Sequence, residues 1–354
     1  MSRITINMPI QVLLMSVVLA ANGLLIAANA KGQNLYVSVY REDGGCILQI
    51  TPSGSFIGGA GQLGTGTPLG IAFNSSGELF VCGYTNILKI STNGVVSIFA
   101  NKLVGTNPRA LAFNSAGTLF VSTYDAYASV GYIIRVNADG ITRTTFASGL
   151  DYPVGLAFDS AGNLFEADAY SGNIYKFTPT GVKSTFASGL WEPFGLAFNS
   201  AGHLFVAEYA SGNIYEYTQS GTKSTFASGL DCPVGLAFNT TGDLFVAQRG
   251  AGGGQYATYI MKISPSGGTN VFGKSMILPW GVAFPPLPPN IQAANSGSNL
   301  LISVSMPSPY YSTLLQASTN LVNWVNVNTN TPSFIFTDSI ASFPHRFYRA
   351  SVIR

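Results

Sequence analysis

A seven-residue motif occurs six times in this chain and sets a repeat length close to 40 residues. It is best kept in YPVGLAF, EPFGLAF and CPVGLAF, which begin at Tyr152, Glu192 and Cys232. Looser copies are TPLGIAF, NPRALAF and LPWGVAF, which begin at Thr67, Asn107 and Leu278. The six prolines, at positions 68, 108, 153, 193, 233 and 279, are therefore 40, 45, 40, 40 and 46 residues apart. A period of this length built from short strands indicates a propeller or a linear array.

Four short strands fit into each repeat. In the repeat that starts at Gly155, the apolar run GLAF leads into the glycine turn DSAGN, and NLFEAD, NIYKF and KSTFAS follow as further strands. A second landmark, L-[FY]-[VE], marks the second strand of each repeat and begins at Leu35, Leu79, Leu119, Leu164, Leu204 and Leu244. Four such strands make one propeller blade.

The two ends of the repeat region are incomplete in complementary ways. The first repeat begins at Leu35 with its second strand, whereas the last motif, Leu278–Phe284, supplies a first strand that no blade follows. Pairing these ends completes six blades and closes the ring, which removes the exposed sheet edges that invite aggregation. We therefore predict an all-β chain with a six-bladed β-propeller over residues 31–284.

The composition excludes some classes of partner. Only 9% of the 354 residues are charged and the formal net charge is +2, so the chain lacks the basic surface of a nucleic-acid-binding protein. Aromatic residues make up 12% of the chain, which is too many for a disordered protein. We expect a folded monomer that binds no nucleic acid.

The N-terminus has the pattern of a secretory signal peptide. Arg3 precedes an apolar stretch that begins at Val12, and an A-x-A site ends at Ala30, which predicts a signal peptide over residues 1–30. The alternative is an uncleaved membrane anchor over Val12–Ala28. Either way, we expect the folded part to be exported to the periplasm, the cell surface or the medium. The membrane then serves only for export or surface attachment.

The sequence changes character after the last repeat. Residues 285–290 are rich in proline and predict a stiff linker. Beyond them, short apolar runs alternate with turns rich in Asn, Ser and Pro, as in a small β-sandwich. The stretches LLQASTNLVNWVNVNT and FTDSIASFPHRFYRA resemble the small fibronectin-type-III-like modules appended to bacterial secreted proteins. This resemblance implies an accessory or attachment module over residues 291–354.

The repeat pattern P-x-G-[LI]-A-F-x-x-x-G-x-L-[FY]-V-A resembles NHL-type repeats. It is also similar to the propellers of the regucalcin and gluconolactonase family and of streptogramin B lyase. The resemblance implies the architecture and says little about activity, because propellers carry many functions. In NHL-type propellers the first strand of each blade lines the central channel. The resemblance therefore places the variable residue of each P-x-G at the channel mouth.

These variable residues are poor metal ligands. In the regucalcin and gluconolactonase family, Asn and Asp at such positions, with a Glu from near the N-terminus, hold one divalent cation through oxygen atoms. The residues here are Leu69, Arg109, Val154, Phe194, Val234 and Trp280. Apolar side chains cannot replace the hydration shell of a metal, and a guanidinium repels it. We therefore expect no metal and no other cofactor.

Carboxylates elsewhere keep an enzymatic alternative open. Asp168 and Glu208 occupy equivalent positions after the second strands of neighbouring repeats, where they could form a catalytic pair or bond the backbone of adjacent loops. Glu166 stands where other repeats have valine, so it must be paired, protonated or at an opening. Together with Glu42, these residues could hold the divalent cation of a lactonase-like hydrolase.

A lyase of the streptogramin type is not expected. The resemblance to that enzyme implies a catalytic histidine, and the repeat region contains only His203. This residue lies in the turn SAGHLF, where neighbouring repeats have Asn163 and Asp243, so it reads as a solvent-facing turn residue. No nucleophile elbow, HExxH, P-loop or EF-hand pattern occurs in the sequence.

The predicted channel mouth consists mainly of aromatic and polar residues. Aromatic faces with polar handles suit sugars, peptides and small apolar ligands. The candidate ligand-binding residues are Arg109, Trp191, Glu192, Phe194, Tyr209 and Trp280. We interpret the protein as noncatalytic, binding a carbohydrate, peptide or small molecule at this mouth. The alternatives are the metal-dependent hydrolase and a structural surface protein.

Overall fold

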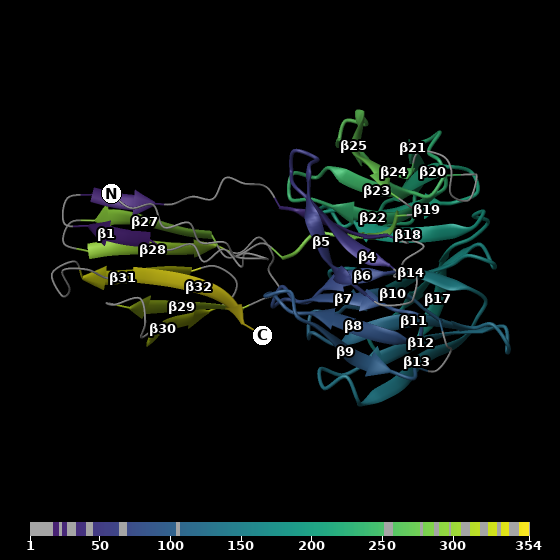
Figure 1. Ribbon diagram of the computed structural model, residues 1–354, viewed down its shortest axis with the longest axis horizontal. Coiled ribbons are helices and arrows are strands. Elements are labelled where there is room, and N and C mark those ends of the chain that lie inside the picture. Colours follow the sequence, from purple (N-terminus) through teal and green to yellow (C-terminus); the bar gives the residue numbers. More distant parts are fainter. Residues whose placement is uncertain are drawn as a thin grey trace. The chain divides into compact units, whose positions relative to one another are not determined.

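The computed structural model divides the chain into two compact units, Gln33–Asn74 with Glu78–Pro285, and Met1–Gly32 with Ser75–Gly77 and Pro286–Arg354. It describes residues 17–20, 23–26, 33–39, 45–63, 69–103, 107–250, 258–276, 279–286, 290–296, 299–305, 312–318, 325–330, 334–339 and 347–353. Within these ranges every regular element is a β-strand (Figure 1). The all-β prediction is therefore confirmed.

The larger unit is a six-bladed propeller, as predicted, and each blade is an antiparallel sheet of four strands. The first two complete blades are β6 (Ile71–Phe73), β7 (Leu79–Cys82), β8 (Asn86–Ile90) and β9 (Val96–Asn101), then β10 (Asn107–Phe113), β11 (Leu119–Asp125), β12 (Val130–Val136) and β13 (Arg143–Leu150). The third and fourth are β14 (Pro153–Phe158), β15 (Leu164–Asp168), β16 (Asn173–Phe177) and β17 (Lys183–Ala187), then β18 (Pro193–Phe198), β19 (Leu204–Glu208), β20 (Asn213–Tyr217) and β21 (Lys223–Ala227). The fifth is β22 (Pro233–Phe238), β23 (Leu244–Gln248), β24 (Thr258–Ile263) and β25 (Thr269–Met276).

The sixth blade joins the two ends of the propeller sequence. It has the order β26 (Pro279–Ala283), β3 (Leu35–Val39), β4 (Cys46–Ile50) and β5 (Phe56–Gln62). Strand β26 is antiparallel to β3, with Pro279 opposite Val39 and Val282 opposite Val37. The prediction that the ring closes by pairing its first and last strands is therefore confirmed.

The final phenylalanine of the GLAF motif packs between blades. Phe158 on β14 contacts Phe120 of the preceding blade edge to face, with ring centroids 5.1 Å apart. The same contact, at 4.9 to 5.1 Å, recurs in the pairs Tyr36–Phe73, Phe80–Phe113, Phe165–Phe198, Phe205–Phe238 and Phe245–Phe284. Such edge-to-face pairs contribute beyond the apolar area they bury. They explain why an aromatic residue is kept at this position in every repeat.

The glycine of P-x-G lies where the innermost strands of adjacent blades come closest. A Cβ added to Gly155 would be 2.0 Å from the carbonyl oxygen of Phe194, the variable residue of the next blade. The same approach, at 2.2 to 2.6 Å, is made by Gly70 to Arg109, Gly195 to Val234, Gly235 to Trp280 and Gly281 to Leu69. A side chain has no room there, so the glycine allows the ring of blades to close at its axis.

The smaller unit contains two sheets. One has the order β2 (Gly23–Ile26), β1 (Val17–Ala20), β32 (Phe347–Ile353), β29 (Ser312–Ser318) and β30 (Val325–Asn330). The other is β27 (Asn290–Ser296), β28 (Asn299–Ser305) and β31 (Phe334–Ser339). The fibronectin-type-III label remains a prediction, as do the domain boundaries.

Strands β1 and β2 lie within the segment that predicts a signal peptide. Val17 of β1 pairs with Tyr348 of β32, and the rest of residues 1–30 falls outside the described residues. The described residues contain no helix that is long and apolar enough to cross a membrane. Cleavage after Ala30 remains a prediction.

The close contact between Gly195 and the Val234 carbonyl at the propeller axis predicts that Gly195→Ala is less stable. The new methyl group would meet the backbone of Val234, which cannot move without shifting its blade, so we expect about 1–3 kcal/mol of destabilisation. Thermal unfolding followed by circular dichroism measures it. Gly268→Ala is the matched control, because that exposed glycine meets only the flexible Ser264 hydroxyl, and its Tm should not fall. Equal Tm values for the two variants would contradict the axial-contact argument.

Candidate functional site

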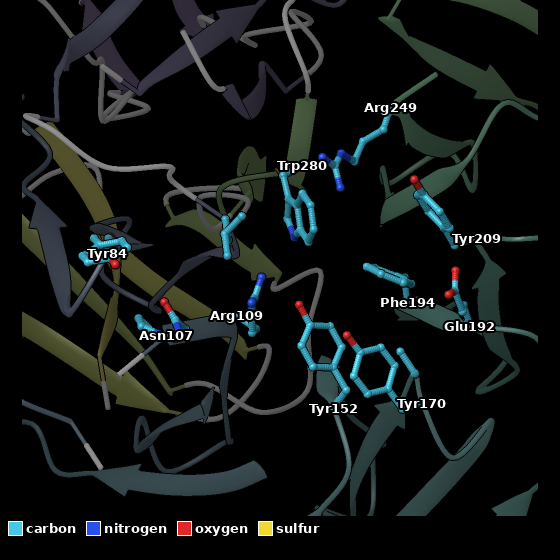
Figure 2. A pocket seen from close by; sticks show the side chains of 14 residues that line it. Tyr84, Asn107, Arg109, Tyr152, Tyr170, Glu192, Phe194, Tyr209, Arg249 and Trp280 are labelled. Carbon is cyan, nitrogen blue, oxygen red and sulfur yellow. The ribbon is translucent and has the colours of Figure 1, made fainter. Parts of the chain in front are cut away.

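A cavity of about 430 Å³ opens among the loops where the chain enters the blades. Its walls come from two kinds of loop, those before the innermost strands and those after the second strands (Figure 2). The lining residues are Leu69, Gly83, Tyr84, Asn107, Pro108, Arg109, Tyr152, Ala169, Tyr170, Glu192, Phe194, Tyr209, Arg249 and Trp280. This volume is in the range of pockets that hold a small ligand.

Four of the six variable residues line this cavity, namely Leu69, Arg109, Phe194 and Trp280. The other two, Val154 and Val234, are only 6% and 4% exposed, and they pack in the same apolar cluster as Phe194. The variable position therefore supplies both the wall of the cavity and the apolar layer that supports it.

Aromatic rings form two groups in the cavity wall. Tyr152 and Tyr170 stack with centroids 4.3 Å apart and planes 11° from parallel. Phe194 contacts Tyr209 at 5.0 Å and Trp280 at 5.9 Å. Figure 2 shows the tyrosine pair and the Phe194 group on adjacent sides of the site. The wall is thus built from ring faces that hold one another in place.

Two arginines enter the cavity, and each lies over an aromatic ring. The guanidinium carbon of Arg109 is 4.9 Å from the centroid of Tyr152, and that of Arg249 is 4.6 Å from Trp280. Such stacking is favourable because the ring face is negative. Arg249 follows β23 at the position that Tyr84 and Tyr209 occupy in other repeats.

The hydroxyl groups of Tyr152 and Tyr209 stay protonated at neutral pH. Burial raises the pKa of Tyr152, although the positive charge of Arg109 acts in the opposite direction. Burial also raises the pKa of Tyr209, with a hydrogen bond to the Cys232 side chain as the next cause. Both hydroxyls can therefore donate a hydrogen bond to a ligand.

Glu192 has an unusual backbone conformation. Its φ is 55°, in the left-handed region that residues other than glycine seldom adopt, and Cys232 at the equivalent position has φ 51°. The carbonyl of Glu192 accepts a hydrogen bond of 2.9 Å from the Tyr209 N–H. This bond joins the two loops that form the cavity wall at this blade. Strained residues of this kind cluster at ligand sites.

Trp191, the neighbour of Glu192, does not line the cavity. Its side chain is 67% exposed, and its backbone N–H is the group that is anchored, to Glu208. Of the six candidate ligand-binding residues, the structure thus brings together Arg109, Glu192, Phe194, Tyr209 and Trp280, and it leaves Trp191 outside the lining.

The candidate ligand-binding residues predicted from the sequence do not include Arg249, Asn107 or the tyrosine pair Tyr152–Tyr170. The alignment of repeats contained the signal for Arg249, because it is a cation at a position that is mostly tyrosine.

Asp168 and Glu208 bond the loop backbone. The Asp168 carboxylate accepts hydrogen bonds from the N–H groups of Asp151 at 2.8 Å and of Tyr152 and Ser171 at 3.2 Å. Glu208 accepts from Trp191 N–H at 2.8 Å, from the Ser211 hydroxyl and from the Tyr215 hydroxyl at 3.3 Å. Gln248, the equivalent residue of the next blade, accepts from Asp231 N–H at 2.6 Å. One structural role is thus shared by three residue types.

Glu166 lies inside the propeller wall. It is fully buried on β15 between Leu156 and Tyr175, and both carboxyl oxygens lack a hydrogen-bond partner within the described part of the chain. Burial, reinforced by the negative charge of Asp168, raises its pKa well above the usual value, while Lys183 acts in the opposite direction. The group is therefore held as a neutral acid, and it does not line the cavity.

The carboxylates of the hydrolase alternative do not form a metal cluster. Among the residues that the structure describes, no three His, Cys, Asp or Glu side chains lie close enough to hold an ion. Glu42 lies outside the described residues.

His203 is bonded away from the cavity. Its Nδ1 is 2.7 Å from Glu216 Oε1, and its backbone N–H donates to the Asn199 side chain in the predicted turn.

Comparisons with known proteins extend the fold assignment. No family model matches the chain, and no curated protein matches its sequence. A protein of unknown function from Bacteroides caccae superposes with TM-score 0.55 and 15% identity, over 72% of this chain and 99% of that one. A catalytically inactive virginiamycin B lyase from Staphylococcus aureus with quinupristin gives 0.50 and 13%, over 96% and 100%. The calcium-binding protein regucalcin from Agrobacterium tumefaciens gives 0.50 and 16%, over 63% and 85%.

These likenesses show the fold. The chain is a six-bladed β-propeller with structural neighbours that include a regucalcin and a virginiamycin B lyase. At 16% identity or less, they do not transfer an activity to this chain.

Glu166→Val should stabilise the protein at neutral pH. The unfolded chain ionises this carboxyl above about pH 4.3, whereas the raised pKa keeps it protonated in the fold, so folding becomes less favourable as pH rises. We expect a gain of about 2 kcal/mol at pH 7 that shrinks toward pH 4, measured by urea unfolding. A gain independent of pH would contradict this account of a neutral buried acid.

Asp168→Ala is the matched comparison, because it removes a nearby carboxylate that has partners. Its loss leaves three backbone N–H groups without their acceptor, so we expect about 1–3 kcal/mol of destabilisation in the same assay. We expect the free energy of unfolding to rise in Glu166→Val and to fall in Asp168→Ala, because only the second carboxylate has hydrogen-bond partners among the described residues. Changes of the same sign would contradict this distinction.

Proposed function

We propose that the protein is a noncatalytic binding protein that holds a small molecule, or one end of a carbohydrate or peptide, in the cavity of about 430 Å³. The observation that carries this proposal is the lining itself, in which aromatic faces surround two arginines and one carboxylate. Rings already packed against one another lose little freedom when a ligand binds, so the site is preorganised.

The chemistry of the lining favours binding over hydrolysis. General acid–base hydrolysis needs a pair of groups that can exchange protons with the substrate. Among the described residues, Glu192 is the one carboxylate in the lining, and Asp168 and Glu208 lie outside it and accept backbone hydrogen bonds. The calcium-binding neighbour and the lyase share the fold, but this chain has apolar or cationic residues at its variable positions.

The setting we propose is an exported monomer. The signal-peptide pattern at the N-terminus supports export, and the predicted module over residues 291–354 would then serve for attachment. A small soluble ligand, or the end of a chain at the cell surface, is accessible in that setting.

Binding is tested with the full chain and a panel of neutral sugars, dipeptides and single-ring aromatic compounds, observed by saturation-transfer NMR. We expect at least one compound to bind, and Trp280→Ala to weaken it about tenfold because a buried ring face is lost. Trp191→Ala is the matched control, since that ring is outside the lining, and it should affect only ligands that extend beyond the cavity. Failure of the whole panel to bind, or binding indifferent to Trp280, would contradict the proposal.

The hydrolase alternative is tested by metal addition after chelation. A specific ion at 100 times its Kd would add about 2.7 kcal/mol, or roughly 5–10 °C in Tm for a domain of this size. We expect Ca²⁺, Mg²⁺, Mn²⁺ and Zn²⁺ each to leave the Tm unchanged. A shift of that size that disappears in Asp168→Asn would favour the hydrolase instead.

A further inference from the structure

The charges of the described lining residues are unbalanced. Arg109 and Arg249 contribute two positive charges to the lining, and Glu192 contributes one negative charge. Neither arginine has an ion-pair partner within 4.0 Å among the described residues, although other cations such as Lys89 and Lys262 do. A half-buried guanidinium without a counter-ion is unusual, because burial of a charge is costly unless it is paired.

Stacking orients these guanidinium groups and leaves one N–H of each, that on Nε, without an acceptor among the described residues. Each lies over a ring, Arg109 over Tyr152 and Arg249 over Trp280, which sets its plane. The Nε atoms of both are buried and have no hydrogen-bond partner in the part of the chain that the structure describes. Arginine carries five N–H donors in a planar fork that matches a carboxylate or a phosphate. Each of the two side chains thus presents an oriented donor that has no acceptor among the described residues.

The neutral polar groups of the cavity add more donors. The Tyr152 hydroxyl lies beside Arg109, and burial raises its pKa further above neutral, so it remains a phenol. The Tyr209 hydroxyl belongs to the same wall as Arg249, and the positive charge of Arg249 acts to lower its pKa against the larger effect of burial. In Figure 2, Arg109 and Arg249 lie on either side of Trp280, and Glu192 lies beyond Phe194. The two arginines therefore lie near Trp280, apart from Glu192.

We propose that the ligand of this cavity is a small organic anion that carries a flat ring. Arg109 and Arg249 hold its carboxylate, sulfonate or phosphate group, and its ring lies against Phe194 and Trp280. This inference rests on the proposed function, because it specifies which ligand the same cavity takes. Glu192, at the other side of Phe194, suits a hydroxyl or amino substituent on the ring.

The volume agrees with a ligand of one or two rings. A cavity of about 430 Å³ is at the smaller end of the range for small-molecule sites. The residues in the wall that are most exposed, Tyr170 and Tyr84 at 60% and 66%, mark the open side. A longer substituent can leave the cavity past them.

Three compounds with the same ring system and different charge test the proposal by isothermal titration calorimetry with the full chain. They are naphthalene-1-carboxylate, naphthalen-1-ylmethanol and naphthalen-1-ylmethylammonium. We expect the carboxylate to bind about tenfold more tightly than the alcohol, as charge-assisted hydrogen bonds imply, and the ammonium compound to bind least. Added salt should weaken the binding of the carboxylate and leave that of the alcohol unchanged.

Variants then locate the anion. Arg109→Gln and Arg249→Gln should each weaken the binding of the carboxylate about tenfold and change that of the alcohol less than about twofold. Arg135→Gln is the matched control, because Arg135 is exposed on β12 outside the lining, and it should change neither. Circular dichroism shows whether each variant is folded.

The outcomes separate the two proposals. Equal binding of alcohol and carboxylate to the wild-type chain would overturn the anion inference and leave the binding function standing. A preference for the carboxylate that survives both arginine variants would also overturn it, because the anion would be held elsewhere. Binding of none of the three compounds up to millimolar concentration would overturn the anion inference and count against the binding function as well.

Discussion

Close backbone contact at the axis is the constraint on which the propeller depends. Six innermost strands must meet around a narrow channel, and five of them do so by placing a glycine against a carbonyl of the next blade. Gly155 against Phe194 shows the geometry: the carbonyl of the variable residue packs on the glycine. The ring therefore closes through main-chain atoms. The side chain at x is consequently not needed for closure and can change from leucine to arginine or tryptophan without loss of the fold.

Main-chain contacts close the ring, and variable side chains line the cavity. This division explains how much of the structure could be predicted from the sequence. The repeat period, the missing first strand and the surplus last motif together determine six blades and the pairing of β26 with β3. The equivalence of repeats also places Arg109, Phe194 and Trp280 around one opening, because equivalent residues of a ring lie at equivalent depths. These inferences need only the connectivity of the chain.

Other features depend on three-dimensional detail that a repeat alignment does not contain. Val154 and Val234 are equivalent to Phe194, yet they do not line the cavity and instead lie buried in the apolar cluster that supports it. Trp191 is excluded from the lining by its place one residue before Glu192, whose left-handed backbone redirects the chain. The lack of hydrogen-bond partners for Glu166 among the described residues is a property of the packed structure, which residue identity alone does not reveal. The sequence therefore identifies the set of residues that could line the cavity, and packing decides which of them do.

Ring closure also links the cavity to the order in which the chain is made. The Gly281 N–H donates to the Ser38 hydroxyl, which in turn donates to the Leu69 carbonyl, so contacts at the axis join residues 243 positions apart. Contacts of such long sequence separation form late, because loop-closure entropy must be overcome first. Trp280, Arg249 and Leu69 belong to different ends of the propeller sequence, yet they share one wall. A nascent or truncated chain thus has folded blades before it has a binding site, and the finished cavity marks a chain that is complete through β26.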